Sequence, residues 1–166
     1  ASLIILSTSF IYVDLLNLYS ESILILISLV LRVYNINLDD LWFDEILSFW
    51  VADPNISIKE SFQRHTSIEG VPFLYNFFLK FFFQFFNYNV TSGKYLSLVF
   101  NALSIVCIVN TSKTIKKNNA YIFCLFLLCA NIYLIIFSQE LRAYSLVLFF
   151  FSLNIFIFFK SLQKKY

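Results

Sequence analysis

The sequence predicts an all-α, polytopic integral membrane protein with about four transmembrane helices and a long outer loop that carries juxtamembrane helices. Hydrophobic residues make up 60% of the 166-residue chain and charged residues only 13%, whereas soluble domains carry about 25% charged residues. The mean hydropathy is +0.77. The apolar residues also form stretches close to the roughly 20 residues that a crossing helix needs. We therefore treat residues 1–166 as a single membrane domain.

The first predicted span covers residues 15–34. It contains two charged residues, Glu21 and Arg32. Arg32 lies close enough to the end of the span to reach the membrane interface by snorkelling. Residues 1–14 either extend this helix or belong to an earlier one, and the sequence leaves both alternatives open.

The predicted outer loop covers residues 35–94 and contains two helical patterns. Residues 57–67 form a short amphipathic pattern with Ile58 and Phe62 on one face. Residues 72–86 are strongly apolar but too short for a typical span. Pro72 is suited to the first turn of a helix, so we expect this segment to lie against the membrane rather than to cross it.

Three further spans are predicted at residues 95–112, 119–137 and 141–159. The loop at 113–117 and the tail at 160–165 together hold six of the twelve basic residues. Cytoplasmic loops collect Lys and Arg, so these two segments are predicted to lie inside. Residues 35–94, which contain seven acidic residues, then lie outside, and so does the polar cluster between the last two spans.

Two polar clusters interrupt the apolar sequence, and the first is the acidic pair Asp44-Glu45. Charged residues near a bilayer are usually paired and functional. Two adjacent carboxylates repel each other, which suits one of them to accept a proton. The pair is also able to hold a divalent cation, or it is simply a solvated loop acid, the interpretation that we prefer for Asp39-Asp40.

The second cluster is the run from Ser138 to Tyr144, which we expect to open the last helix on the outer side. Backbone N–H groups at a helix start, together with Arg142, suit an anion. Glu140 and Tyr144 are spaced to share one helical face. The alternative is a Glu140–Arg142 pair that only satisfies itself. Lys94 either joins this anion site or snorkels, and a lipid phosphate is the ligand that the combination suggests.

Five segments in this order resemble the polyprenyl-phosphate-sugar-dependent membrane glycosyltransferases, a group that includes the dolichyl-phosphate-mannose protein mannosyltransferases and the lipid A aminoarabinose transferase. The chain looks like the N-terminal part of such an enzyme. It departs from the family pattern at Gly70-Val71-Pro72, where His-Pro-Pro is common, and at Lys94, where Arg is common. The matching segments are residues 31–34, 41–45, 71–75, 94–96 and 138–144.

The resemblance implies an inverting sugar transfer at the outer face of a membrane, which we expect to be the bacterial inner membrane. Asp44 would deprotonate the acceptor, with support from Glu45. Arg142 and Lys94 would hold the lipid-linked phosphate, and Glu140 would orient the donor or Arg142. The other residues expected to bind substrate are Gln139 and Tyr144.

The implied partners are a polyprenyl-phosphate sugar donor, the lipid bilayer and an acceptor that is a protein, a lipid or a glycan. A divalent cation is the one cofactor considered. The net charge of +2 is too small to indicate a nucleic-acid partner. The rival interpretation is a non-enzymatic lipid-binding or transporter-like subunit, although transporters place charges near the midplane and show repeats. We expect all three cysteines to be buried core residues: Cys107, Cys124 and Cys129.

Overall fold

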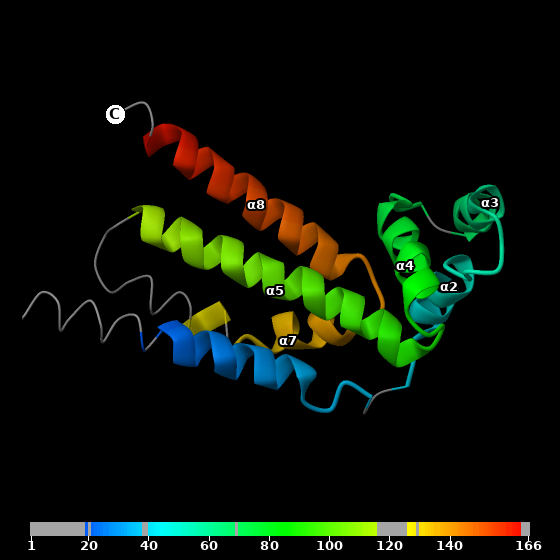
Figure 1. Cartoon of the computed structure of the whole chain (residues 1–166), viewed down its shortest axis with the longest axis horizontal. Helices are drawn as coiled ribbons and strands as arrows, with labels where there is room; N and C mark the ends of the chain where they lie inside the picture. Colours follow the sequence, from blue (N-terminus) through cyan, green and yellow to red (C-terminus); the bar gives the residue numbers. More distant parts are fainter. Residues whose placement is uncertain are drawn as a thin grey trace, which may run out of the picture.

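The computed structural model describes residues 19, 21–37, 40–68, 70–115, 126–128 and 130–163. Within these ranges every regular element is a helix, which confirms the predicted all-α class for this part of the chain. The long helices lie side by side, and three short helices gather at one end of them (Figure 1).

Among the described residues, two helices are long and apolar enough to cross a membrane, α5 (Val90–Ile115) and α8 (Tyr144–Gln163). They contain the predicted spans at 95–112 and most of 141–159. The other two predicted spans lie partly outside the described residues. Of the first, residues 21–33 are helical, and of the third, the structure describes 126–128 and α7 (Ile132–Gln139). Four crossings therefore stay a prediction.

The first described helix, residues 21–33, runs antiparallel to α5 (Figure 1). At one end Lys113 forms an ion pair with Glu21, with Nζ 2.8 Å from Oε2. Further along, Arg32 Nε donates to Asn101 Oδ1 at 2.6 Å. Arg32 is buried, so the predicted snorkelling is wrong. Its guanidinium is instead satisfied between helices, as a charge inside a helix bundle must be.

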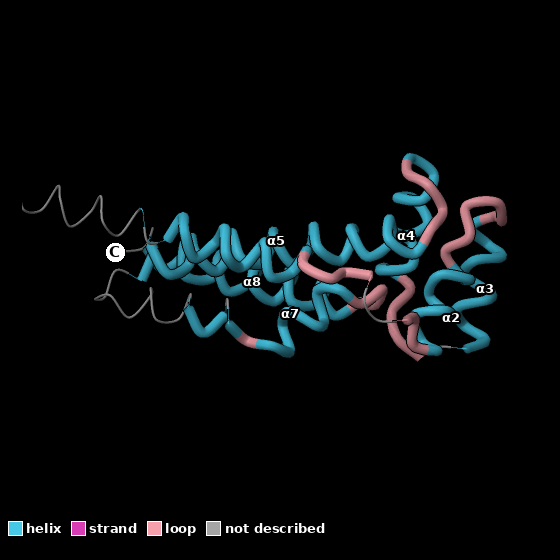
Figure 2. The backbone as a smooth tube through the Cα atoms, turned by 90° about the horizontal axis from the view of Figure 1, so that it is seen from below, coloured by secondary structure: helices cyan, strands magenta, loops and turns pink. Residues whose placement is uncertain are grey.

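Helices α5 and α8 run parallel, because α7, which comes between them in the sequence, runs in the opposite direction (Figure 1). Their C-terminal ends are joined where Gln163 Nε2 donates to the carbonyl of Thr114. At the opposite end, Gly93 of α5 packs against Leu141, the fully buried residue that precedes α8. Figure 2 shows the same bundle from below, with the short helices again at one end.

Three short helices form the outer-loop region: α2 (Phe43–Val51), α3 (Ile58–Ile68) and α4 (Leu74–Phe85). Helices α3 and α4 match the predicted patterns at 57–67 and 72–86, whereas α2 lies where a loop was expected. Helix α4 runs across the end of α5 rather than alongside it (Figure 1). That residues 72–86 lie against the membrane rather than cross it stays a prediction.

Helix α3 turns its polar side inward. The expected apolar residues Ile58 and Phe62 are 55% and 50% exposed. The buried residues are Ser61 and His65, and Ser61 Oγ donates to the carbonyl of Val51 at 2.6 Å. The apolar face is therefore half exposed, with Phe62 packed edge-on against Phe73 at a centroid distance of 5.4 Å.

Lys80 fixes α4 to the α2–α3 connection. Its side chain is buried and Nζ donates to the carbonyls of Asp53 and Ile56, the latter at 2.7 Å. Burial lowers the pKa of this amine, an effect that the nearby charge of Asp53 opposes. The main core lies where α4 meets α5 and the start of α8, and its buried members are Ala52, Tyr75, Leu79, Phe83, Leu96, Phe100, Leu141 and Leu146.

Candidate functional site

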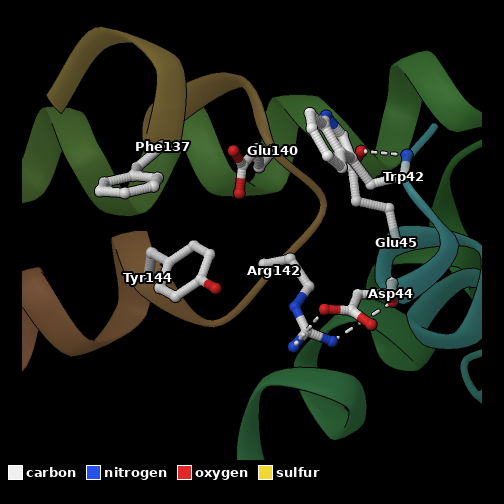
Figure 3. Close-up of a pocket in the computed structure, with 7 residues that line it drawn as sticks. All are labelled: Trp42, Asp44, Glu45, Phe137, Glu140, Arg142 and Tyr144. Atoms are coloured by element: carbon white, nitrogen blue, oxygen red, sulfur yellow. Dashed lines mark hydrogen bonds and ion pairs between the residues drawn. The ribbon is translucent and has the colours of Figure 1, made fainter. Parts of the chain in front are cut away.

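The two polar clusters meet at one cavity of about 200 Å³ at the end of the bundle that carries the short helices (Figure 3). One wall comes from the start of α2 and the other from the end of α7, the turn after it and the start of α8. Seven residues line the cavity: Trp42, Asp44, Glu45, Phe137, Glu140, Arg142 and Tyr144. The two clusters, which the sequence predicted only to share the outer side, therefore line one cavity.

Asp44 and Arg142 form the contact between the two walls. Arg142 Nη2 lies 3.5 Å from Asp44 Oδ2, and Nη1 donates to the Asp44 carbonyl at 3.3 Å. The Asp44 side chain is 61% exposed and that of Arg142 is 17% exposed. A pair this open to solvent contributes about 0–1 kcal/mol to stability, so an incoming ligand separates it at little cost.

Glu45 has a different role from the one expected of it. It is 2% exposed. Its Oε2 accepts from the backbone N–H of Trp42 at 2.9 Å, and its Oε1 accepts from the N–H of Leu141 at 2.6 Å. Both oxygens are thus occupied by backbone donors, and Glu45 joins α2 to the turn before α8 rather than acting together with Asp44.

Glu140 lies at the C-terminus of α7 and is partly buried. Burial raises the pKa of its carboxyl, and the charge of Glu45 raises it further, whereas Arg142 and Lys94 oppose the shift. The predicted start of the last helix is wrong, because residues 140–143 form a turn and α8 begins at Tyr144. The N–H of Leu141 in this turn is taken by Glu45, so Glu140 and Tyr144 reach the cavity without sharing a helical face.

Gln139 and Lys94 hold the backbone at the end of the first helix. Gln139 Nε2 donates to the carbonyls of Arg32 and Tyr34, both at 2.9 Å. Lys94, which lies inside α5 and is buried, donates from Nζ to the carbonyl of Ile36 at 3.0 Å. Terminal helix carbonyls need such partners. Both side chains line a cavity of about 30 Å³ that adjoins the first one at Trp42, Glu45 and Glu140. Their direct contact with substrate stays a prediction.

Tyr144 supplies an apolar and aromatic wall. Its ring centroid lies 4.8 Å from that of Phe137, and both rings face the same cavity as Arg142 (Figure 3). The cavity thus combines charged and aromatic side chains, with Trp42 near Glu45 and Glu140 near Phe137 (Figure 3), and such a lining suits a ligand with a phosphate and a chain or ring attached to it.

No group of three or more His, Cys, Asp or Glu side chains that is able to hold a metal ion occurs among the residues that the structure describes. Of the cysteines, Cys107 is buried and free, and Cys124 and Cys129 lie outside the described residues. A divalent cation at Asp44 stays a hypothesis.

A second cavity of about 120 Å³, which the sequence did not predict, meets the first at Arg142 and Tyr144. It is bordered by α2, by the segment before α4 and by α4 itself, with Asn76 of α4 among its lining residues. His65 of α3 is buried and bound to Asn76. Helical spacing did not reveal it, because Phe62 and His65 are three residues apart and lie close together on the helix surface; Phe73 packs against both rings.

The comparisons with family models, with curated proteins and with solved structures gave no significant match. The function is therefore argued from the site itself.

Proposed function

We propose that the chain carries the donor-binding part of the active site of an inverting glycosyltransferase, which moves a sugar from a polyprenyl phosphate to an acceptor. The observation that carries the proposal is the meeting of Asp44 and Arg142 in one cavity at the end of the apolar helices. A carboxylate, a guanidinium and an aromatic wall are the groups that transfer from a lipid-linked phosphate needs.

Arg142 is the group that binds the phosphate. A guanidinium presents paired N–H donors that match phosphate oxygens, and Arg142 sits mostly buried beside the aromatic pair of Tyr144 and Phe137. The ion pair with Asp44 is then the resting state. When the phosphate takes the place of Asp44 on Arg142, the Asp44 carboxylate is released to act on the acceptor.

Asp44 is the general base. The acceptor oxygen attacks the anomeric carbon on the face opposite the phosphate, and the bond from that carbon to the phosphate oxygen breaks. The phosphate leaves with the bonding electron pair, and Asp44 takes the acceptor's proton. Arg142 stabilises the charge that develops on the phosphate. The sugar ends with inverted configuration because a single displacement has occurred.

Glu140 sets the charge of the cavity. Because burial favours its neutral form, it opposes an incoming anion less than a fully ionised carboxylate would. In its protonated form it also has an O–H to donate to a phosphate oxygen. Its proposed part is to orient the donor beside Arg142.

The test is sugar transfer by membranes that contain the full-length protein, with a panel of polyprenyl-phosphate sugars as donors. Asp44→Asn is expected to lower transfer by at least about a hundredfold, the usual range for removal of a general base, and to leave donor binding intact. Asp40→Asn changes an exposed acid that does not line the cavity and is expected to keep full activity. Equal activity of the two variants would remove Asp44 as the base.

Arg142→Ala is expected to raise the donor KM about 10- to 150-fold, which corresponds to about 1.5–3 kcal/mol for a charged hydrogen bond. Arg64→Ala is the matched control, because Arg64 pairs with Glu60 on α3. If wild-type membranes bind the lipid phosphate but transfer no sugar from any donor in the panel, the non-enzymatic lipid-binding interpretation replaces the enzyme.

A further inference from the structure

The second cavity is built around a buried amide. Asn76 lines it and is 3% exposed. Among the residues that the structure describes, Asn76 Oδ1 is the one buried side-chain polar atom that has no hydrogen-bond partner. A buried acceptor without a donor is unfavourable, and in native proteins it marks strain, a catalytic role or a bound water or ion.

The orientation of this amide follows from its neighbour. His65 Nε2 lies 2.6 Å from the carbonyl of Val71, which is only able to accept, so Nε2 carries the proton. The neutral imidazole then accepts at Nδ1. Asn76 Nδ2 lies 3.0 Å from that atom and donates to it. The amide nitrogen is thus held by His65, and Oδ1 is kept available for a donor from elsewhere.

The cavity is larger than one water needs. It measures about 120 Å³, whereas a water molecule occupies about 30 Å³ in the liquid. Its lining combines Asn76 with the ring of Tyr75 and with Pro72. A few polar groups among apolar and aromatic ones suit a ligand with several hydroxyl groups on a compact ring.

The position of the cavity indicates that this ring is the sugar attached to the bound phosphate. The two cavities meet at Arg142 and Tyr144. A sugar joined to a phosphate on Arg142 has to lie within one bond of that phosphate, and the second cavity is the adjoining space on the side of α4. The first cavity, with its Phe137–Tyr144 wall, is then left for the phosphate and the start of the lipid chain.

We propose that the second cavity holds the sugar of the lipid-linked donor, and that Asn76 Oδ1 accepts a hydrogen bond from one of its hydroxyl groups. The inference rests on the proposed function, because it takes the same lipid-linked sugar as ligand. His65 is a positioning residue that fixes the amide. A site built to bind a hydroxyl strongly rejects an analogue that lacks it, so Asn76 selects among sugars by the hydroxyl that it binds.

The test is equilibrium binding to the full-length protein in nanodiscs, with no transfer step. The probes are bare polyprenyl phosphate and polyprenyl phosphates that carry mannose, glucose, galactose or 4-amino-arabinose. At least one sugar is expected to tighten binding about tenfold over the bare phosphate. If none does, the sugar cavity is overturned even where Arg142 binds the phosphate.

The second arm identifies the contact by a double-mutant cycle between protein and ligand. With the best sugar, one monodeoxy analogue is expected to bind wild type about tenfold more weakly. In Asn76→Leu the loss of the same hydroxyl is expected to have no further effect, whereas Gln84→Leu, on an exposed position of the same helix, behaves as wild type. If removal of each hydroxyl weakens binding equally in Asn76→Leu and in wild type, Asn76 binds water only and the proposal fails.

The third arm compares the two substrates in the transfer assay. Asn76→Leu is expected to raise the donor KM and to leave the acceptor KM unchanged. A rise in the acceptor KM alone would assign the cavity to the acceptor and overturn the donor assignment.

Because the deoxy series in wild-type protein needs no variant, recognition of a sugar hydroxyl stays testable if Asn76→Leu does not fold. Absence of transfer with intact sugar-dependent binding would contradict the enzyme but not the sugar cavity.

Discussion

Asp44 and Glu45 are adjacent carboxylates with different surroundings. Successive residues on an α-helix point about 100° apart, and both lie in the first turn of α2. One side chain therefore reaches solvent and Arg142, and the other is buried against Leu141. Two neighbours that look equivalent in the sequence therefore differ in the structure: Asp44 is open to the cavity, and Glu45 is a buried contact between α2 and the turn before α8.

Glu45→Gln is expected to destabilise the protein by about 2 kcal/mol, because an amide NH₂ placed beside one of the two backbone N–H donors leaves that donor buried and unpaired. Thermal unfolding in detergent measures the effect. Glu60→Gln is the control, since Glu60 is exposed and makes only a surface pair with Arg64 at 2.7 Å. Equal Tm values for the two variants would show that Glu45 does not hold α2 to the turn before α8.

Glu140 gives the stability a pH dependence. Its carboxyl pKa is raised in the folded chain, first by burial and then by Glu45, so the folded state keeps this proton to a higher pH than the unfolded state does. The contribution of Glu140 is complete below the ordinary value of about 4.3 and is lost as the pH rises through the folded value. Glu140→Gln is therefore expected to raise the Tm at pH 8 relative to wild type and to leave it nearly unchanged at pH 4. A Tm difference that is the same at both pH values would contradict this expectation.

Among the helices, α5 depends on a glycine for its close approach to the turn before α8. A Cβ on Gly93 would come within 2.2 Å of Leu141 Cδ1 and 3.0 Å of Phe83 Cζ. Leu141 is fully buried, so its side chain has no solvent to move into, and α5 has to shift away from its neighbours.

Gly93→Ala is expected to destabilise the fold by about 1–3 kcal/mol, the usual effect of overpacking, which exceeds the gain of about 1 kcal/mol from replacing a helical glycine. Gly70→Ala is the matched control, because no atom lies within 4 Å of a Cβ built there. Unfolding temperatures of the two variants decide the point. A stabilised Gly93→Ala would mean that α5 and Leu141 are not closely packed.

The sequence predicted α3, α4, α5 and the body of α8 because apolar periodicity and length determine them. It missed α2, which begins directly after the aromatic residue Trp42 and is stabilised from a distance by the Leu141 contact of Glu45. It also extended the last helix through residues 140–143, since nothing in that run of helix-forming residues announces the turn. Glu45 and Leu141 are 96 positions apart in the chain, and a local sequence pattern does not reveal a contact between such distant residues.

For the candidate site, the sequence predicted which residues belong to the two polar clusters but not the contacts that each residue makes. Charge distribution along the chain predicted only that Asp44 lies on the same side as Glu140 and Arg142, and the structure brings them to one cavity. It was not enough to show that Gln139 and Lys94 are used to satisfy carbonyls at the end of the first helix. Those carbonyls become available only when the helix ends at its C-terminus, which depends on the whole bundle.

In the whole molecule, the pairing of the first helix with α5 decides which ends lie together. The ion pair of Glu21 with Lys113 marks one end, and the hydrogen bond from Thr91 Oγ1 to Asn37 Oδ1, at 3.0 Å, marks the other. The chain between Asn37 and Thr91 therefore leaves and returns at the same end of the bundle. If the first helix and α5 both cross a membrane, helices α2, α3 and α4 all lie on one side of it.

Impermeant maleimide labelling of single cysteines tests this topology, in a background where Cys107, Cys124 and Cys129 are replaced by Ser. Asp40→Cys and Asn87→Cys flank the short helices at exposed positions, and both are expected to react from outside intact cells. Thr114→Cys and Ser161→Cys lie at the opposite end of α5 and α8 and are expected to react only after permeabilisation. All four label in permeabilised cells, which controls for accessibility. Protection of Asn87→Cys alongside reaction of Asp40→Cys would mean that α4 crosses the membrane, which would place Asp44 and Arg142 on opposite sides and end the case for a shared site.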